Sequence, residues 1–213
     1  ALGNMLLGFR ETKKILEDYK IPFLKTQLVK TKGEAKRVVQ KIGWPVVLKI
    51  SSPEVLHRTE KRLLEVNLQN EKELERAFDE ILQRAKGRKI EGILVQKMAR
   101  GIEVTYGMKR DASFGPVLMF GLGGVFVEVL KDVRFGIAPL TKKEAKEMIK
   151  EIKGYKILKG YRGSPPANLS ELSRILVQLS KLSEDHPEIK EIDFNPVFVN
   201  KKRVQVADFK FLI

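Results

Sequence analysis

The sequence predicts a mixed α/β (α+β) fold made of two lobes. Helix and strand patterns alternate over the first half, whereas strand patterns follow one another closely in the second. The chain has 213 residues, 43% of them hydrophobic, enough for one substantial domain or two small lobes. We expect a boundary near residue 95, with lobes over residues 1–95 and 96–213 and a ligand cleft where they meet.

The first lobe is predicted to alternate between helices and strands. Apolar residues at helical spacing mark the helices, with Pro22 after the first and Gly43 after the second, and continuous or alternating apolar runs mark the strands. In chain order we expect helices over residues 11–19 and 32–42, strands over 46–50 and 64–68, a helix over 71–86 and a strand over 92–98.

The second lobe is predicted to be antiparallel, because short strand patterns are separated only by Asp, Gly and Ser. Two helices follow them, the first opened by a capping box of Thr141 and Glu144. In chain order we expect strands over residues 102–108, 116–120, 126–130 and 135–138, helices over 141–152 and 169–183, and short strands around 192 and over 197–199 and 204–207.

Composition excludes several classes of protein. The longest apolar runs fall far short of the roughly 20 residues that a membrane span requires. The absence of cysteine excludes disulfides, thiolate catalysis and cysteine-based zinc sites. The apolar N-terminus has no basic lead-in and no small-residue cleavage site, so we expect no signal peptide and a cytoplasmic protein.

The chain is strongly basic, with 41 Lys and Arg against 27 Asp and Glu and a net charge of +14. A polyanionic partner would explain this balance, and nucleic acid, nucleotide phosphates and an acidic protein subunit all qualify. A highly charged, thermophile-like surface explains it equally well. Charge alone therefore does not select a function.

A lysine and a histidine stand close together in the first lobe. Lys49 lies within the apolar strand 46–50, where a buried ammonium is costly unless it meets an anion, either a ligand phosphate or an internal carboxylate. His57 lies in the loop that leaves this strand, where an imidazole can act on a phosphoryl group, although a lone loop histidine usually has no special role. The other histidine, His186, is predicted to be structural or solvated.

A glycine-rich turn connects two strands of the second lobe. Gly121, Gly123 and Gly124 would let backbone amides approach an anion, but a tight hairpin needs the same residues. Glu103, at the start of the same lobe, is either a ligand contact or an ordinary strand acid. Asp132, after the turn, either lines the cleft or pairs with a neighbouring cation.

Oxygen-bearing side chains gather near the C-terminus. Asp193 and Asn195 share one strand face by the period of two, and the returning strand can bring Asp208 opposite them. Carboxylate and amide oxygens suit magnesium that bridges nucleotide phosphates. A turn-forming Asn-Pro pair and a chance acid are the alternative.

Taken in order, these segments resemble the ATP-grasp β subunit of the ADP-forming acetyl-CoA (acyl-CoA) synthetases, relatives of the succinyl-CoA synthetase β subunit. The resemblance covers nearly the whole chain, and the glycine-centred stretch is its most specific part. It is carried by residues 15–22, 43–50, 52–60, 114–133, 160–163 and 193–199.

The resemblance implies a two-lobed ATP-grasp fold with the nucleotide in the cleft between the lobes. It implies reversible phosphoryl transfer, in which acyl-CoA, ADP and phosphate are exchanged for acid, ATP and CoA. ATP or ADP and Mg²⁺ would bind this chain. The CoA and acyl chemistry would lie on a partner α subunit.

The resemblance also implies roles for individual residues. His57 matches the phosphohistidine, and Lys49 matches the lysine that binds phosphate. The expected magnesium ligands are Asp193, Asn195 and Asp208, and the expected nucleotide contacts are Lys49, Glu103, Gly121, Gly123, Gly124 and Arg134.

Two positions depart from the family pattern. A glycine-containing loop normally follows the histidine, whereas here Arg62 and Leu63 stand in its place. The arginine expected at position 136 is replaced by Gly136, and Arg134, two residues earlier on the same face, is the candidate substitute.

Two other functions are consistent with the sequence. A non-catalytic or regulatory relative would bind nucleotide without turnover. A basic nucleic-acid-binding protein would show an exposed aromatic platform, whereas most aromatic residues here fall in apolar strand runs.

Overall fold

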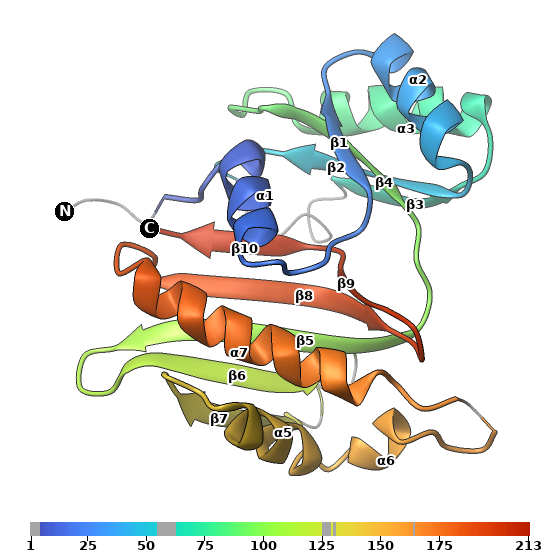
Figure 1. Ribbon diagram of the computed structural model, residues 1–213. Coiled ribbons are helices and arrows are strands. Elements are labelled where there is room, and N and C mark those ends of the chain that lie inside the picture. The colour runs from blue at the N-terminus through green and yellow to red at the C-terminus, as the bar shows by residue number, and fades with distance from the viewer. Residues whose placement is uncertain (1–4, 55–62, 125–128, 130, 164) are drawn as a thin grey trace. The chain divides into compact units, whose positions relative to one another are not determined.

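The computed structural model describes residues 5–54, 63–124, 129, 131–163 and 165–213 (Figure 1). They form two compact units. Residues 5–11 and 24–99 make up the N-unit, and residues 12–23 and 100–213 make up the C-unit. This division differs from the predicted lobes in two respects, because residues 12–23 belong with the second half of the chain and residues 96–99 belong with the first.

In its described residues, the N-unit is a four-stranded antiparallel sheet with helices α2 and α3 and the start of α1. Its strand order is β1-β4-β2-β3. Helices and strands pack through a core of aliphatic side chains that includes Leu48, Ile50, Leu74 and Ile81. The elements are β1 (Thr26–Val29), α2 (Lys32–Ile42), β2 (Val46–Ser51), β3 (Leu64–Leu68), α3 (Glu71–Arg84) and β4 (Gly92–Lys97).

The C-unit is built on a second antiparallel sheet of order β10-β8-β5-β6-β7, with β9 also paired to β8. Helices α5 and α7 pack on one face of this sheet (Figure 1). The elements are β5 (Ile102–Asp111), β6 (Gly115–Leu122), β7 (Val133–Ile137), α5 (Lys142–Lys150), α6 (Tyr155–Leu158), α7 (Leu169–Asp185), β8 (Glu191–Val199), β9 (Val204–Val206) and β10 (Phe209–Leu212). Helix α1 (Phe9–Asp18) is shared between the two units.

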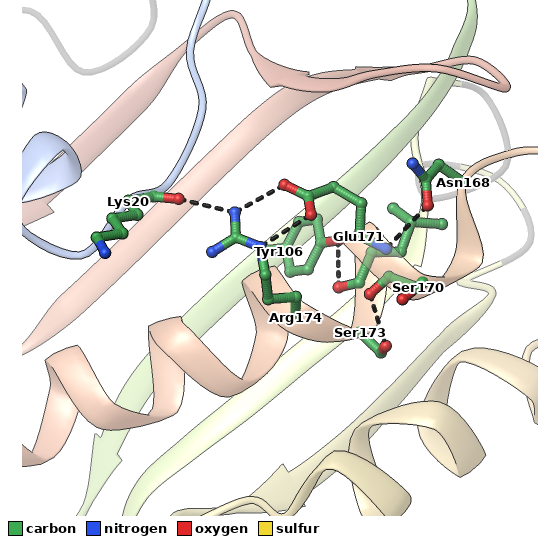
Figure 2. A network of polar contacts seen from close by, with 8 residues as sticks. Lys20, Tyr106, Asn168, Ser170, Glu171, Ser173 and Arg174 are labelled. Carbon is green, nitrogen blue, oxygen red and sulfur yellow. Dashed lines mark hydrogen bonds and ion pairs between the residues drawn. The ribbon is translucent and has the colours of Figure 1, made fainter.

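Polar contacts fix α7 to the sheet of the C-unit and to the segment after α1 (Figure 2). The buried Tyr106 hydroxyl of β5 donates to the Leu172 carbonyl at 2.9 Å. Burial raises the pKa of Tyr106 well above its ordinary value, so this hydroxyl remains a donor. Arg174 donates to the Lys20 carbonyl at 2.7 Å and to both carboxylate oxygens of Glu171, which lowers the pKa of Glu171.

Asp132 has a structural role in the C-unit. Its side chain is 2% exposed and accepts hydrogen bonds from the backbone N–H groups of Lys153 at 2.6 Å and Gly154 at 2.7 Å. The carboxylate therefore links the start of β7 to the turn between α5 and α6. The sequence offered a cleft position or a cation pair, and the observed partners are backbone amides instead.

Replacing Asp132 by alanine is expected to lower the free energy of unfolding by about 3 kcal/mol, because two backbone donors lose a buried, charged acceptor. Urea denaturation measures this loss. Asp111→Ala is a matched control, since Asp111 accepts from two backbone amides in an exposed turn where water can replace it. Equal stability of the two variants would contradict the structural role of Asp132.

Most predicted elements are present, with four differences. Strands β1 and β10 and the short helix α6 were not predicted. Of the strand expected over residues 126–130, only Val129 is described, and it is helical with 74% of its surface exposed. That expectation is wrong at Val129, because a short apolar run fits a helical turn as well as a strand. Within the described part of the chain, no helix combines the length and the apolar composition needed to cross a membrane.

Candidate nucleotide site

The oxygen-bearing residues near the C-terminus lie together in the C-unit. Strand β10 pairs with β8 in a register that places Lys210 beside Asp193, and the Asn195 N–H donates to the Asp208 carbonyl at 3.1 Å. Asp193 and Asn195 are two residues apart on β8 and so share a face. The predicted backbone juxtaposition of Asp193, Asn195 and Asp208 is therefore present.

The glycine-rich turn lies against Glu103. The Gly123 N–H donates to the Glu103 carbonyl at 2.7 Å, and a Cβ atom at Gly123 would lie 3.0 Å from the Glu103 Cβ. A Cβ atom at Gly121 would lie 2.5 Å from the carbonyl oxygen of Asp132. A side chain at Gly121 or Gly123 would thus push the neighbouring backbone apart, so the close packing of this turn requires glycine.

The turn and the acidic residues share one face of the C-unit sheet. Tyr106 of β5 points to the face covered by α7, as its bond to α7 shows. Its neighbours Thr105 and Gly107 therefore point to the opposite face of the sheet. Gly121 pairs with Thr105, and Asp193 pairs with Gly107, so both lie on this opposite face as well. Glu103 is two residues before Thr105 and belongs to the same face. One sheet surface thus carries oxygen-bearing side chains and the close-packed backbone of the glycine turn.

Arg134 is not on this surface. It pairs with Phe120, which pairs with Tyr106, so its side chain points to the face covered by helices. There its Nε lies 3.8 Å from the Glu151 carboxylate at the end of α5, and its Nη1 donates to the Val133 carbonyl. The structure therefore separates Arg134 from the other predicted nucleotide contacts of the C-unit. Gly136 shares that helix-covered face, since a Cβ atom there would lie 2.5 Å from the Met148 sulfur.

Lys49 lies in the N-unit on a buried strand. It alternates with Leu48 and Ile50, which belong to the core beneath α2 and α3, so its side chain points to the opposite face of the sheet. Its side chain is nevertheless only 5% exposed. A buried ammonium at this place fits the expected site for an anion.

The same face of the N-unit carries polar side chains that the sequence did not single out. Gln96 is two positions along the β2–β4 ladder from Lys49 and is 3% exposed, and its amide donates to the Thr26 hydroxyl at 2.7 Å. Ser51 follows Lys49 by two residues and is also buried. Gln96 interrupts an apolar strand in the same way as Lys49, and this signal could have identified it.

The two histidines differ in what the structure describes. His57 lies outside the described residues, so its predicted place near the phosphate remains a prediction. His186 follows α7, where its Nδ1 lies 2.9 Å from the Glu188 carboxylate and its ring packs edge-on against Tyr19. These contacts support the structural role predicted for His186.

The donor chemistry of the C-unit surface suits a hard cation. Among the described residues, no three His, Cys, Asp or Glu side chains gather into a metal cluster. The predicted set of Asp193, Asn195 and Asp208 contains two carboxylates and one amide, which are oxygen ligands of the kind that magnesium shares with water and phosphate. The residues present thus fit magnesium held jointly with a nucleotide.

The model of the ATP-grasp domain family matches residues 1–213. The chain belongs to the ATP-grasp family. It is 42% identical to the acetate–CoA ligase (ADP-forming) I subunit beta of Pyrococcus furiosus, over 95% of this chain and 90% of that subunit. Within the ATP-grasp family, it therefore belongs with the beta subunits and beta regions of the ADP-forming acetate–CoA ligases, and the resemblance found in the sequence is confirmed.

A longer relative and a solved structure extend this comparison. The chain is 47% identical to acetate–CoA ligase (ADP-forming) I of Archaeoglobus fulgidus, but it spans only 31% of the length of that protein. The structure of Ca. Korarchaeum cryptofilum acetyl-coenzyme A synthetase 1, in complex with coenzyme A, Ca-AMPCP and HgCl⁺, superposes with a TM-score of 0.93 at 41% identity. That match covers 98% of this chain and 93% of the solved chain. The expected ATP-grasp fold is confirmed.

Proposed function

We propose that this ATP-grasp chain binds ADP or ATP with Mg²⁺ and exchanges a phosphoryl group between the nucleotide and His57. It would form the beta part of an ADP-forming acetate–CoA or related acyl-CoA ligase, which converts acyl-CoA, ADP and phosphate to acid, ATP and CoA. The observation that carries the proposal is the 42% identity over nine-tenths of the Pyrococcus furiosus subunit beta.

Phosphoryl transfer requires the protein mainly to position the two reactants and to stabilise the charge on the phosphoryl group. In the direction of ATP synthesis, an oxygen of ADP attacks the phosphorus carried by His57, the P–N bond breaks, and ATP and a free imidazole result. Charge spreads over the moving phosphoryl group, and the Lys49 ammonium is suited to neutralise part of it. Asp193, Asn195 and Asp208 would hold magnesium, which lowers the repulsion between phosphate oxygens when it is bound.

The glycine turn and Glu103 would supply the remaining nucleotide contacts. Gly121 and Gly123 let this turn pack closely against Asp132 and Glu103, which would fix its backbone beside the bound nucleotide. Glu103, at the start of β5, has an exposed carboxylate that can accept hydrogen bonds from a sugar or base. Arg134 is left out of this proposal because its side chain points to the helices.

The proposal includes a partner. The chain spans about a third of the Archaeoglobus fulgidus ligase, whereas the Pyrococcus furiosus relative is named a subunit. An α subunit or region would therefore bring the CoA and acyl chemistry. A structure of the Korarchaeum enzyme is described with coenzyme A, Mg-AMPPCP and a phosphohistidine segment pointing towards the nucleotide binding site, which supports a histidine as the phosphate carrier.

The direct test is reconstitution. The chain is co-purified with its cognate α chain, and ATP formation is followed with acetyl-CoA, ADP and phosphate. Turnover that requires all three substrates supports the proposal. Nucleotide binding without turnover would favour a regulatory relative, and binding to nucleic acid that weakens steeply with salt would favour the basic-surface alternative.

Asp208→Asn is expected to raise the Mg²⁺ concentration that gives half-maximal ATP formation by at least about tenfold, because one charged oxygen ligand is lost. Titration of Mg²⁺ at saturating ADP measures the shift. Asp111→Asn changes the same side chain on an exposed turn and should leave the titration unchanged. A normal Mg²⁺ requirement in Asp208→Asn would exclude Asp208 as a ligand.

A further inference from the structure

Side chains continue the pairing of β2 and β4 beyond the end of the strands. The last paired residues are Ser51 and Gly92, and the Glu91 N–H then donates to the Ser51 carbonyl at 2.7 Å. After Ser51 the chain continues through residues 52–54 to residues 55–62, which include His57. The next contacts between the two segments are made by side chains.

Both the backbone N–H and the backbone carbonyl of Lys89 form hydrogen bonds with side chains that follow β2. The Ser52 hydroxyl donates to the Lys89 carbonyl at 2.5 Å, and the Lys89 N–H donates to the Glu54 carboxylate at 3.1 Å. The Ser52 hydroxyl also accepts from the Glu54 N–H at 3.1 Å. The pair Ser52 and Glu54 thus reproduces, with side chains, the paired N–H and C=O bonds of a strand ladder.

The Glu91 side chain also forms hydrogen bonds at the end of β2. Its carboxylate accepts from the Ser51 hydroxyl at 2.6 Å and from the Phe9 N–H at 3.3 Å. A Cβ atom at Gly8 would lie 2.5 Å from this carboxylate, so the segment before α1 packs closely on it. The end of β2 is therefore fixed to its surroundings in the N-unit.

The chain is also fixed where it returns from residues 55–62. Leu63 has no exposed surface and belongs to the N-unit core, and the Ile50 N–H donates to its carbonyl at 3.0 Å. Lys49 pairs with Leu64 in the β2–β3 ladder. The segment that contains His57 thus starts and ends at anchored residues, and its first anchor depends on the side chains of Ser52 and Glu54.

We propose that Ser52 and Glu54 are positioning residues that, through Lys89, fix the point from which the His57 segment leaves the sheet. This inference rests on the proposed function. His57 follows Glu54 by three residues, so their Cα atoms cannot lie more than about 11 Å apart. Fixing Glu54 therefore limits the volume in which the imidazole must find a phosphoryl group, and misplacement by one ångström can lower such a rate by about 100-fold.

The test compares variants that keep or lose the acceptor for the Lys89 N–H. Glu54→Gln keeps an oxygen that accepts this bond, whereas Glu54→Ala removes it. Glu75→Ala is the matched control, because Glu75 is a partly exposed glutamate of the same unit that pairs with the Lys36 side chain. The rate of His57 phosphorylation by ATP is measured in a single turnover of the complex with its α chain, alongside the affinity for ATP and the melting temperature.

Glu54→Ala is expected to slow phosphorylation about tenfold, within the range of geometric effects. Its ATP affinity and melting temperature should match those of the wild type, and Glu54→Gln and Glu75→Ala should react within about twofold of it. Equal rates in Glu54→Ala and Glu54→Gln would overturn the positioning role alone. Wild-type chain that binds ATP but never carries phosphate on His57 would overturn the proposed function and, with it, this inference.

Discussion

Replacing His57 by alanine is expected to lower ATP formation from acetyl-CoA, ADP and phosphate by at least about three orders of magnitude, because the variant has no group to carry the phosphoryl. The loss should fall on turnover, while the affinity for ADP stays close to that of the wild type, since the proposed nucleotide contacts are other residues. Steady-state assays of the complex with its α chain, together with calorimetric binding of ADP, measure both quantities.

His186→Ala is the matched control for this substitution. Among the described contacts of His186 are the Glu188 carboxylate and the Tyr19 ring, and none involves a residue of the proposed site. We therefore expect turnover close to that of the wild type. Full turnover in the His57 variant would exclude His57 as the phosphoryl carrier, whatever the behaviour of the His186 variant.

Replacing Lys49 by methionine is expected to slow phosphoryl transfer by about 100- to 1000-fold, the loss typical of a donor that stabilises transition-state charge. Methionine keeps an unbranched apolar stem of similar length, so the buried position stays filled. The single-turnover rate of His57 phosphorylation by ATP measures the effect. The affinity for ATP should fall less than the rate, because the moving phosphoryl group develops its charge in the transition state.

Lys36→Met provides the comparison, since Lys36 is a surface residue of α2 that pairs with Glu75. Its removal should leave the rate unchanged. If Lys49→Met transferred phosphate as fast as Lys36→Met, the buried ammonium would have a purely structural role, and the N-unit would lose its assigned contact with phosphate.

Sequence patterns were most informative where one residue broke a strong rule. A lysine within an apolar strand is such a violation, and the structure places Lys49 on a buried strand as expected. Asn195 and Asp208 were brought together by the strand period and a returning chain, and the backbone bond between them shows this juxtaposition. In both cases the prediction from the local sequence pattern agrees with the position of the residues in the fold.

Elements with weak local signals were missed. Strand β1 has four residues and lies at the edge of its sheet, and β10 has four residues and also lies at an edge. Both depend on partners far away in sequence, which no local window contains. Arg134 shows a related limit. The period of two correctly placed it on the same face as Gly136, but only the packing of α5 reveals that this face is covered by helices.

The proposed function requires that a phosphoryl group pass between the nucleotide and His57. The most direct measurement incubates the chain with Mg²⁺ and ATP radiolabelled at the γ-phosphate, and maps the label by peptide mass spectrometry under alkaline conditions that preserve phosphohistidine. We predict acid-labile phosphate on the peptide that contains His57, which is lost again on addition of ADP. Bound ATP with no label on this peptide, or label on another residue, would contradict the account.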